Sequence, residues 1–238
     1  MIPNEYLAFL ITIVIAVGWL RLIDFLAGKG VFPAVISRKI IHIGTGPIFV
    51  LCWMLFPDKT ISRYLAAIIP FLITMQFLLV GLGIIKDEEA VRAMSRSGDR
   101  REILKGPLIY GLVFVVMTIL FWRDNAIGLI TLMILCGGDG MADIIGSRFG
   151  KHKIPWALSK SWQGSAAMFV GSLFLIYLVM FSFQGMGFTQ MNVQYTLLPI
   201  SGIVFIATIV ETLPYGDWDN FFVPLASVIF SYLFLIIK

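Results

Sequence analysis

Long apolar segments recur from one end of this chain to the other, and they constrain the fold more than any other feature. Each is close to the roughly 20 apolar residues that an α-helix needs to cross the hydrocarbon core of a bilayer. A helix is favoured there because it satisfies all of its backbone hydrogen bonds internally. The predicted helical segments are 5–27, 37–56, 61–85, 106–122, 125–147, 163–184, 196–213 and 218–237.

The composition agrees with a membrane protein. Of the 238 residues, 59% are hydrophobic and only 13% are charged, whereas soluble domains carry about 25% charged residues. The first segment lacks the basic region of a cleavable signal peptide, so its helix is expected to stay. Polar groups and glycines interrupt segments 37–56 and 125–147. We therefore expect an all-α, polytopic bundle of seven or eight transmembrane helices, forming a single domain over residues 1–238.

The basic residues predict an orientation, because cytoplasmic loops of membrane proteins carry an excess of lysine and arginine. With the N-terminus outside, the cytoplasmic side holds 14 of the 18 Lys and Arg residues. The opposite side holds Lys59, Arg63, Arg123 and Lys238. We expect a plasma membrane or another cytosol-facing membrane, with the N-terminus outside and the functional site cytoplasmic.

Five groups of polar residues fall at the predicted cytoplasmic ends of these segments. They occur in "SRKIIHIGTGP", "DRREILKGPLIYG", "GGDGMADIIGSRFG", "SKSWQGSAAMF" and "ETLPYGDWDNFFVP". Ionisable groups within membrane segments are costly and usually functional. A channel or transporter would instead place charges near the midplane, in discontinuous helices. The grouping predicts catalytic motifs at 38–42, 100–107, 137–164 and 211–220.

Two aspartates stand out in the third of these motifs. Asp139 and Asp143 are four residues apart, so they share one face of a helix, and they repel unless a cation neutralises them. Magnesium fits, because it is usually held by one or two carboxylates plus substrate phosphates. Nearby glycines allow close approach of a ligand, although Ala142, Gly146 and Gly150 also have the spacing of small residues in helix packing. Basic residues follow, which neutralise phosphate charge. The motif indicates a metal–nucleotide or metal–phosphate site, without the common GxxxxGK[ST] or GxGxxG patterns.

These fragments also carry a family resemblance. "GDGMADIIGSRFGKHKIPW" followed by "KSWQGSAAMF" resembles the phytol kinase and dolichol kinase family of membrane enzymes, and most closely its phytol and farnesol kinase branch. That family is related to phosphatidate cytidylyltransferases and to CTP-dependent diacylglycerol kinases. The supporting motifs are "RKIIHIGTG", "REILKGPLIYG" and "ETLPYGDWDNFFVP". The resemblance therefore covers about residues 37–227.

The resemblance implies a multi-helix membrane fold, Mg²⁺, and CTP as the phosphoryl donor. The family's cytidine-nucleotide motif, D-x-x-A-x-x-x-G-x-x-x-G, matches Asp139, Ala142, Gly146 and Gly150. Two positions depart from the pattern. Ser147 stands where many relatives carry a basic or polar residue before Arg148, and Gln163 stands where some carry glutamate. These departures leave the choice of donor and acceptor open.

On this basis we expect a CTP-dependent kinase that phosphorylates a membrane-embedded isoprenoid alcohol, such as phytol, farnesol or a longer prenol. Its partners are then a lipid alcohol, a cytidine nucleotide and membrane lipids. Nucleic acid is not expected, since the charged segment 84–106 lacks interleaved basic and aromatic residues. Two alternatives stay open: a cytidylyltransferase that activates a lipid phosphate such as phosphatidate, and a CTP-dependent diacylglycerol kinase.

Roles for individual residues follow from the motifs and the resemblance together. The expected catalytic residues are Asp139, Asp143, Lys160, His42 and Glu211. The expected nucleotide-binding residues are Gly138, Gly140, Ala142, Gly146, Arg148, Gly150, Lys151, Lys153, Ser161, Arg38, Lys39 and Arg101. The expected Mg²⁺ ligands are Asp139, Asp143, Asp219 and Asn220. Either a carboxylate or His42 would accept the proton of the substrate hydroxyl.

Overall fold

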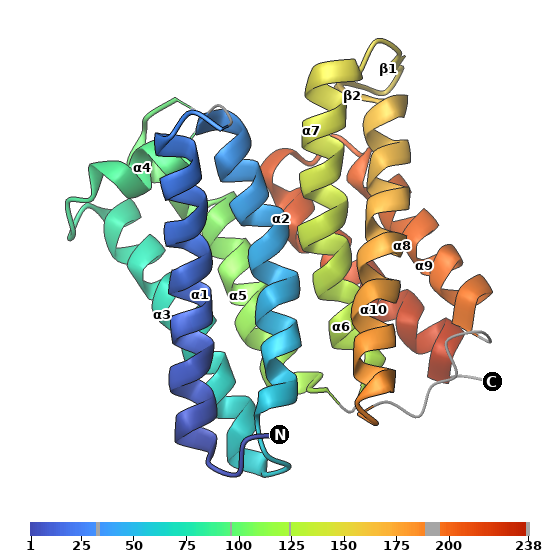
Figure 1. The fold of residues 1–238 in the computed structure, drawn as a ribbon. Helices are drawn as coiled ribbons and strands as arrows, with labels where there is room; N and C mark the ends of the chain where they lie inside the picture. The colour runs from blue at the N-terminus through green and yellow to red at the C-terminus, as the bar shows by residue number, and fades with distance from the viewer. Residues whose placement is uncertain (32–33, 96, 124, 189–195, 237–238) are drawn as a thin grey trace.

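The computed structural model describes residues 1–31, 34–95, 97–123, 125–188 and 196–236. These residues form a helical bundle with one small β-hairpin at one end (Figure 1). The helices are α1 (Glu5–Gly28), α2 (Ala34–Cys52), α3 (Thr60–Leu82), α4 (Glu88–Met94), α5 (Gly106–Leu120), α6 (Ala126–Met133), α7 (Asp139–Phe149), α8 (Trp162–Gly185), α9 (Leu197–Glu211) and α10 (Asp219–Ser231). The hairpin pairs β1 (Lys153–Ile154) with β2 (Ala157–Ser161) in antiparallel fashion. Shorter helical turns occupy Trp53–Leu55, Arg100–Leu104, Ile134–Gly138, Gly216–Trp218 and Tyr232–Ile236.

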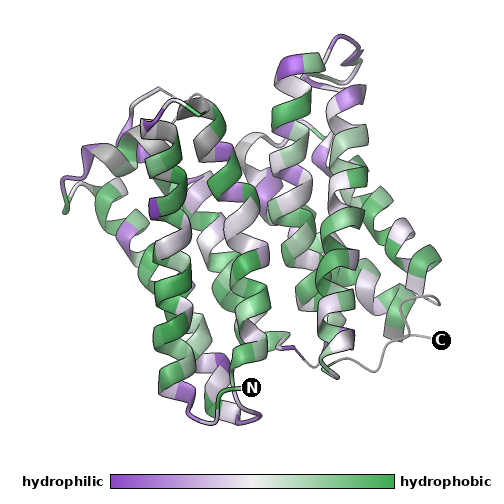
Figure 2. Ribbon diagram, viewed as in Figure 1, coloured by the Kyte–Doolittle hydropathy of each residue, from purple (hydrophilic) through white to green (hydrophobic). Residues whose placement is uncertain are grey.

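Apolar helices occur at all eight predicted positions, which confirms a polytopic helical membrane protein. Within the described ranges, five helices are long and apolar enough to cross a bilayer: Glu5–Ile23, Thr60–Leu82, Arg100–Leu120, Ala126–Phe149 and Trp162–Gly185. Three shorter apolar helices are Lys39–Leu55, Leu197–Glu211 and Asp219–Leu235. The helices are predominantly hydrophobic along their length (Figure 2), and large side chains such as Val170 and Phe174 point outward. Lipid tails are as apolar as these side chains, so their exposure carries no penalty in a membrane.

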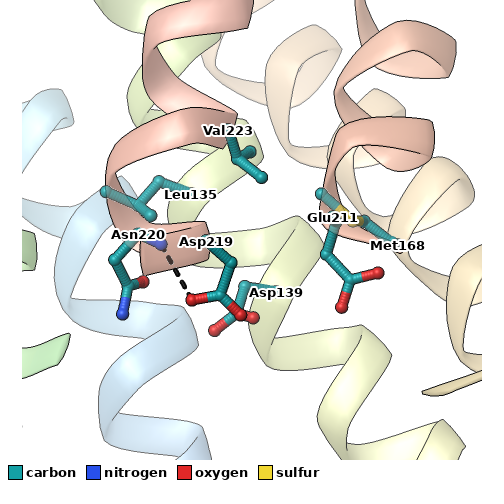
Figure 3. Close-up of a pocket in the computed structure, with 7 residues that line it drawn as sticks. All are labelled: Leu135, Asp139, Met168, Glu211, Asp219, Asn220 and Val223. Atoms are coloured by element: carbon teal, nitrogen blue, oxygen red, sulfur yellow. Dashed lines mark hydrogen bonds between the residues drawn. The ribbon is translucent and has the colours of Figure 1, made fainter. Parts of the chain in front are cut away.

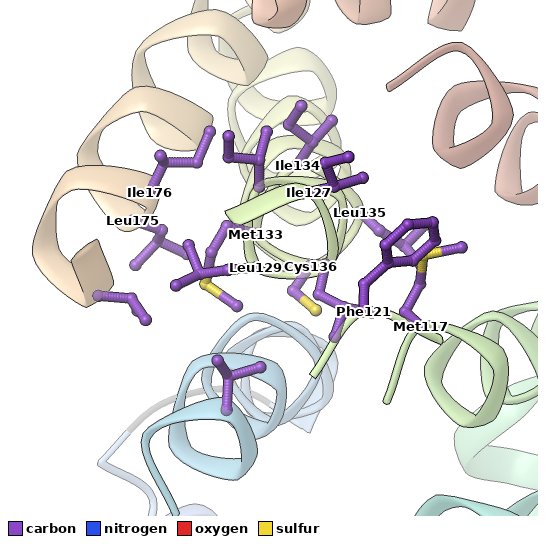
Figure 4. Packing of buried hydrophobic residues seen from close by; sticks show 14 of the residues in the cluster. Met117, Phe121, Ile127, Leu129, Met133, Ile134, Leu135, Cys136, Leu175 and Ile176 are labelled. Atoms are coloured by element: carbon purple, nitrogen blue, oxygen red, sulfur yellow. The ribbon is translucent and has the colours of Figure 1, made fainter. Parts of the chain in front are cut away.

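The helix built from α6, the turn Ile134–Gly138 and α7 lies at the centre of the bundle. In the most apolar stretch of this helix, 78% of the residues are buried, compared with 39% or less in the other four helices that are long enough to cross a bilayer. Met133, Ile134 and Leu135 are fully buried in the hydrophobic core (Figure 4), and this region packs against α2, α8 and α10. The central position brings Asp139, the first residue of α7, within reach of several other helices.

A π-helical turn, Ile134–Gly138, interrupts the central helix immediately before Asp139. Its two glycines allow α8 to approach closely, because a Cβ atom at Gly137 would overlap Leu175 and one at Gly138 would overlap Ser172. A π-turn accommodates an additional residue and so rotates the residues that follow it; such turns are frequent at functional sites. The turn therefore sets the direction in which Asp139 points.

The two ends of the bundle differ in charge. The C-terminal end of α1, helix α4 and the β-hairpin lie at one end, and the N-terminus and the start of α3 lie at the other (Figure 1). Lys29, Lys86 and Lys151 therefore share the hairpin end with most of the basic residues. At the opposite end, Lys59 pairs with Glu5 at 2.6 Å. Within the described ranges, the bundle therefore carries more basic residues at the hairpin end than at the opposite end.

Candidate active site

Three carboxylates from three different parts of the chain line one small pocket (Figure 3). Asp139 begins α7, Glu211 ends α9, and Asp219 begins α10 after the turn Gly216–Trp218. The remaining lining residues are Leu135, Met168, Asn220 and Val223. The space between them is close to that of one water molecule, the minimum that a polar cavity needs to hold one. The pocket is therefore the size of a single water or ion.

Lys160 brings a positive charge to this pocket from strand β2. Its ammonium forms an ion pair with Glu211, and it lies 3.4 Å from Oδ2 of Asp219. Burial alone lowers the pKa of Lys160, but the neighbouring carboxylates of Glu211, Asp219 and Asp139 outweigh it, so the pKa lies above its ordinary value. The neighbouring carboxylates therefore favour the charged form of Lys160. Its single charge faces three carboxylates, which leaves the pocket acidic.

A second group of residues surrounds Asp139 from the side of α2 and α5. Nε2 of His42 lies 3.6 Å from Oδ2 of Asp139, and both side chains are 35% exposed. The His42 ring packs against the Tyr110 ring at 4.7 Å between centroids, and the Tyr110 hydroxyl lies 3.1 Å from Sγ of Cys136. Asp139 thus lies between the carboxylate–lysine pocket on one side and the contact of His42 with Tyr110 on the other.

The second aspartate of the motif makes different contacts. Oδ2 of Asp143 lies 3.0 Å from Nζ of Lys39, and its side chain is 59% exposed. The same ammonium is 3.3 Å from the hydroxyl of Ser147. Asp143 lies one helical turn beyond Asp139, nearer the hairpin end. Lys39 thus supplies the neutralising charge, and the joint binding of Mg²⁺ by Asp139 and Asp143 stays a prediction.

Asn220 adjoins the pocket and links it to the 100–107 motif. Its backbone N–H donates to Oδ1 of Asp219 at 2.8 Å. A Cβ atom at Gly106 would lie 3.0 Å from the Asn220 side-chain nitrogen, so only a glycine permits this approach without displacement. Arg101 of the same motif is exposed, and its backbone N–H donates to Asp99. The motif thus contributes a close backbone contact through Gly106.

The residues expected to bind the nucleotide divide into two sets. Arg148, Lys151 and Lys153 are exposed on or beside the hairpin, and the side chain of Arg38 lies outside the described part of the structure. Ser161 accepts a hydrogen bond from the backbone N–H of Gly164 at 3.1 Å and thereby caps α8. Lys153 pairs with Ser161 in the hairpin, next to Lys160, and the role of these residues in nucleotide binding stays a prediction.

The small residues of the motif pack against other helices. A Cβ atom at Gly140 would overlap Ile43 of α2, and one at Gly150 would overlap Ser161. Gly146 lies against Gly164 of α8, and Ala142 is buried. These residues therefore have a packing function of the kind that small residues serve between membrane helices. Any contact with a nucleotide would be additional to it.

The pocket suits a magnesium ion in the character of its ligands. Mg²⁺ requires oxygen ligands and is commonly held by one or two carboxylates plus substrate phosphates. Asp139, Asp219 and the Asn220 amide provide such oxygens around one small space. Among the described residues, no three His, Cys, Asp or Glu side chains are arranged as a complete metal site. The oxygen ligands are of the type that Mg²⁺ uses, and metal binding at this pocket stays a prediction.

Sequence reasoning missed two residues of this region, Tyr110 and Cys136. Tyr110 is the second-last residue of the "REILKGPLIYG" motif, and Cys136 ends the apolar run that precedes Gly137, so neither belongs to the charged residues that carry the motifs. The hairpin was also not expected. The residue that could have indicated a turn there is Pro155, which follows strand β1 and separates it from strand β2.

The fold and the pocket together define a helical integral membrane protein with an acidic, lysine-containing site between its helices. The chain is 38% identical over 220 residues to the probable phytol kinase, chloroplastic, of Triticum aestivum, covering 92% of this chain and 73% of the relative. It is 38% identical over 212 residues to phytol kinase 1, chloroplastic, of Arabidopsis thaliana, covering 88% and 70%. It is 39% identical over 221 residues to the probable phytol kinase 2, chloroplastic, of Oryza sativa subsp. japonica, covering 91% and 72%. The chain belongs to the phytol kinase family, which confirms the resemblance seen in its motifs. No protein-family model and no solved structure matches the chain significantly.

Proposed function

We propose that this protein transfers the γ-phosphoryl group of CTP to the hydroxyl of a membrane-embedded isoprenoid alcohol, with phytol as the first candidate, in a Mg²⁺-dependent reaction. One observation carries the proposal: Asp139, Glu211, Asp219 and Lys160 meet at one pocket inside a membrane domain. The kinases among the relatives support phytol as the acceptor. The match to the cytidine-nucleotide motif supports CTP as the donor.

Phosphoryl transfer depends mainly on positioning and on stabilising charge, rather than on covalent chemistry by the protein. Asp139, Asp219 and Asn220 would hold the magnesium ion, which neutralises phosphate charge when bound. Lys160 adds a fixed positive charge where a transferring phosphoryl group needs it, and Glu211 holds the Lys160 ammonium in place. The acidic pocket and its lysine thus match a metal-bound phosphate.

His42 is a candidate to accept the proton of the substrate hydroxyl. A general base must come within hydrogen-bond reach of that proton, directly or through one water. His42 is part-exposed, lies next to Asp139 and is oriented by the ring of Tyr110. Asp139 would then stabilise the protonated imidazole. A hydroxyl placed between His42 and the pocket is positioned for both proton removal and phosphoryl transfer.

The choice between kinase and cytidylyltransferase is tested with labelled CTP. We expect purified protein with phytol and Mg²⁺ to transfer label from the γ-phosphorus of CTP to the lipid, and none from the α-phosphorus. Parallel reactions with farnesol, dolichol, diacylglycerol and phosphatidate, and with ATP in place of CTP, define acceptor and donor. Chelation of Mg²⁺ is the control and should stop the transfer. Label from the α-phosphorus in the lipid would instead establish a cytidylyltransferase.

We further infer that the hairpin end of the bundle faces the cytosol and the N-terminus faces the opposite side. The excess of Lys and Arg at the hairpin end supports this orientation. A single cysteine at Ser159 or at Thr60 tests it, since both positions are exposed and the native Cys52 and Cys136 are buried. In sealed cells, a membrane-impermeant thiol reagent should label Thr60→Cys and leave Ser159→Cys unlabelled until the cells are opened. The reverse pattern would contradict the orientation.

A further inference from the structure

The segment Phe149–Trp162, which we call the interface hairpin, joins two of the longest apolar helices. The helix Ala126–Phe149 ends where it begins, and the helix Trp162–Gly185 starts where it ends. Each of these helices has 24 residues, which at about 1.5 Å per residue exceeds the roughly 30 Å hydrocarbon core of a bilayer. The lengths of the two helices allow the interface hairpin to lie at the level of the lipid headgroups.

Large apolar side chains of this hairpin are exposed. Phe149, Trp156 and Trp162 are each 53–54% exposed, and Leu158 is 73% exposed. The hairpin has its own small core, since Ile154 is fully buried, and the Trp156 indole N–H donates to the Thr212 hydroxyl at 3.1 Å. The packing of the hairpin itself therefore leaves these four apolar side chains exposed. Tryptophan at this level is typical of membrane interfaces, where an apolar ring and a polar N–H are both accommodated.

The charge of the hairpin has one sign. No Asp or Glu occurs between Asp143 and Glu211, whereas Arg148, Lys151 and Lys153 lie together and are exposed. Basic clusters beside membrane helices bind anionic lipid headgroups. The same surface thus combines exposed apolar side chains with an unopposed positive charge, and an anionic membrane surface is complementary to both.

We propose that the interface hairpin is embedded in the headgroup layer, with Trp156 and Leu158 in contact with the acyl-chain boundary and Arg148, Lys151 and Lys153 bound to anionic headgroups. On strand β2, Lys160 lies on the same face as Leu158 and reaches the carboxylate pocket. The eleven residues of α7 separate Asp139 from Phe149 by roughly 15 Å along the helix axis. The interface hairpin therefore extends beyond the pocket at the same end of the bundle.

The proposal is tested by spin labels on neighbouring residues of β2, without any measurement of turnover. Leu158→Cys and Ser159→Cys each receive a nitroxide, and the buried native cysteines leave these the reactive positions. Both positions are exposed, but successive strand residues point to opposite faces, which makes Ser159 the matched control. The full-length protein is placed in vesicles of phosphatidylcholine with or without phosphatidylglycerol. Collision rates with oxygen, which concentrates in the acyl region, and with a water-soluble nickel chelate then report depth.

We expect the oxygen-to-nickel ratio to be several-fold higher at position 158 than at 159. Phosphatidylglycerol should raise the ratio at 158 further. The triple substitution Arg148→Gln, Lys151→Gln and Lys153→Gln should remove that increase while leaving the difference between the two positions. Equal nickel access at both positions would overturn the embedding of the hairpin. An identical ratio in both lipid mixtures would overturn the binding of anionic headgroups.

Discussion

Replacement of Asp139 by asparagine is expected to lower the rate of phosphoryl transfer at least about 100-fold, the effect typical of removing one preorganised electrostatic group from an active site. Asp139 is the residue that touches both the carboxylate–lysine pocket and His42. The substitution keeps the shape of the side chain and removes its charge, so it should abolish metal binding without disturbing the central helix. The measurement is the initial rate of γ-label transfer from CTP to phytol, at several Mg²⁺ concentrations.

Asp143→Asn is the matched control, one turn further along the same helix. The Asp143 side chain is 59% exposed and pairs with Lys39, and an exposed ion pair contributes about 1 kcal/mol or less. We therefore expect a loss of no more than about tenfold from this substitution. Losses of similar size for Asp139→Asn and Asp143→Asn would show that the two carboxylates act as a pair, as their spacing in the sequence predicts.

Replacement of Lys160 by methionine is expected to lower the free energy of unfolding by about 3 kcal/mol, because breaking a buried ion pair leaves an uncompensated charge. The Glu211 side chain is only 4% exposed, and Lys160 is its ion-pair partner. The same substitution should also abolish phosphoryl transfer, since it removes the fixed cation from the pocket. Thermal unfolding in lipid–detergent micelles measures the first effect, and the labelled-CTP assay measures the second.

Two further variants separate the contribution of the ion pair from a general effect of the substitution. Lys153→Met, at an exposed position of the same hairpin, should change the free energy of unfolding by less than about 0.5 kcal/mol. The double variant Lys160→Met, Glu211→Gln should recover most of the lost stability and remain inactive, since the buried charge is then gone but the cation is not restored. A double variant as unstable as Lys160→Met would show that the stability of the pocket does not come from this ion pair.

The fold class was predictable because hydrophobicity is a local property of the sequence. Every predicted apolar segment corresponds to a helix, and the main addition is the short hairpin Lys153–Ser161, which lies between two predicted helices. The boundaries also differ within the fifth segment. There the π-turn Ile134–Gly138 divides one predicted helix into α6 and α7, because close packing of α8 against Gly137 and Gly138 depends on residues about 35 positions away.

The candidate site was predictable in its residue types more than in its arrangement. The motifs contain Asp139, Lys160, Glu211 and Asp219, and the structure brings these four together. The expected partnership of Asp139 with Asp143 came from their spacing. That spacing defines a shared helix face and says nothing about neighbours on other helices. The contacts of Tyr110 and Cys136 near Asp139 had no counterpart in the polar pattern.

The sequence by itself determined that this protein is a bundle of membrane helices with polar motifs at one end. A helix that crosses a bilayer needs about 20 apolar residues, and ionisable residues within such segments are costly and usually functional. The motifs also carried the family. The tertiary structure decided which charges meet. Lys160 lies 51 residues from Glu211 and 59 from Asp219 along the chain, and only the packing of α8, α9 and α10 around the central helix brings them to one pocket. Helix packing depends on side-chain shape over the whole bundle, and no local pattern encodes it.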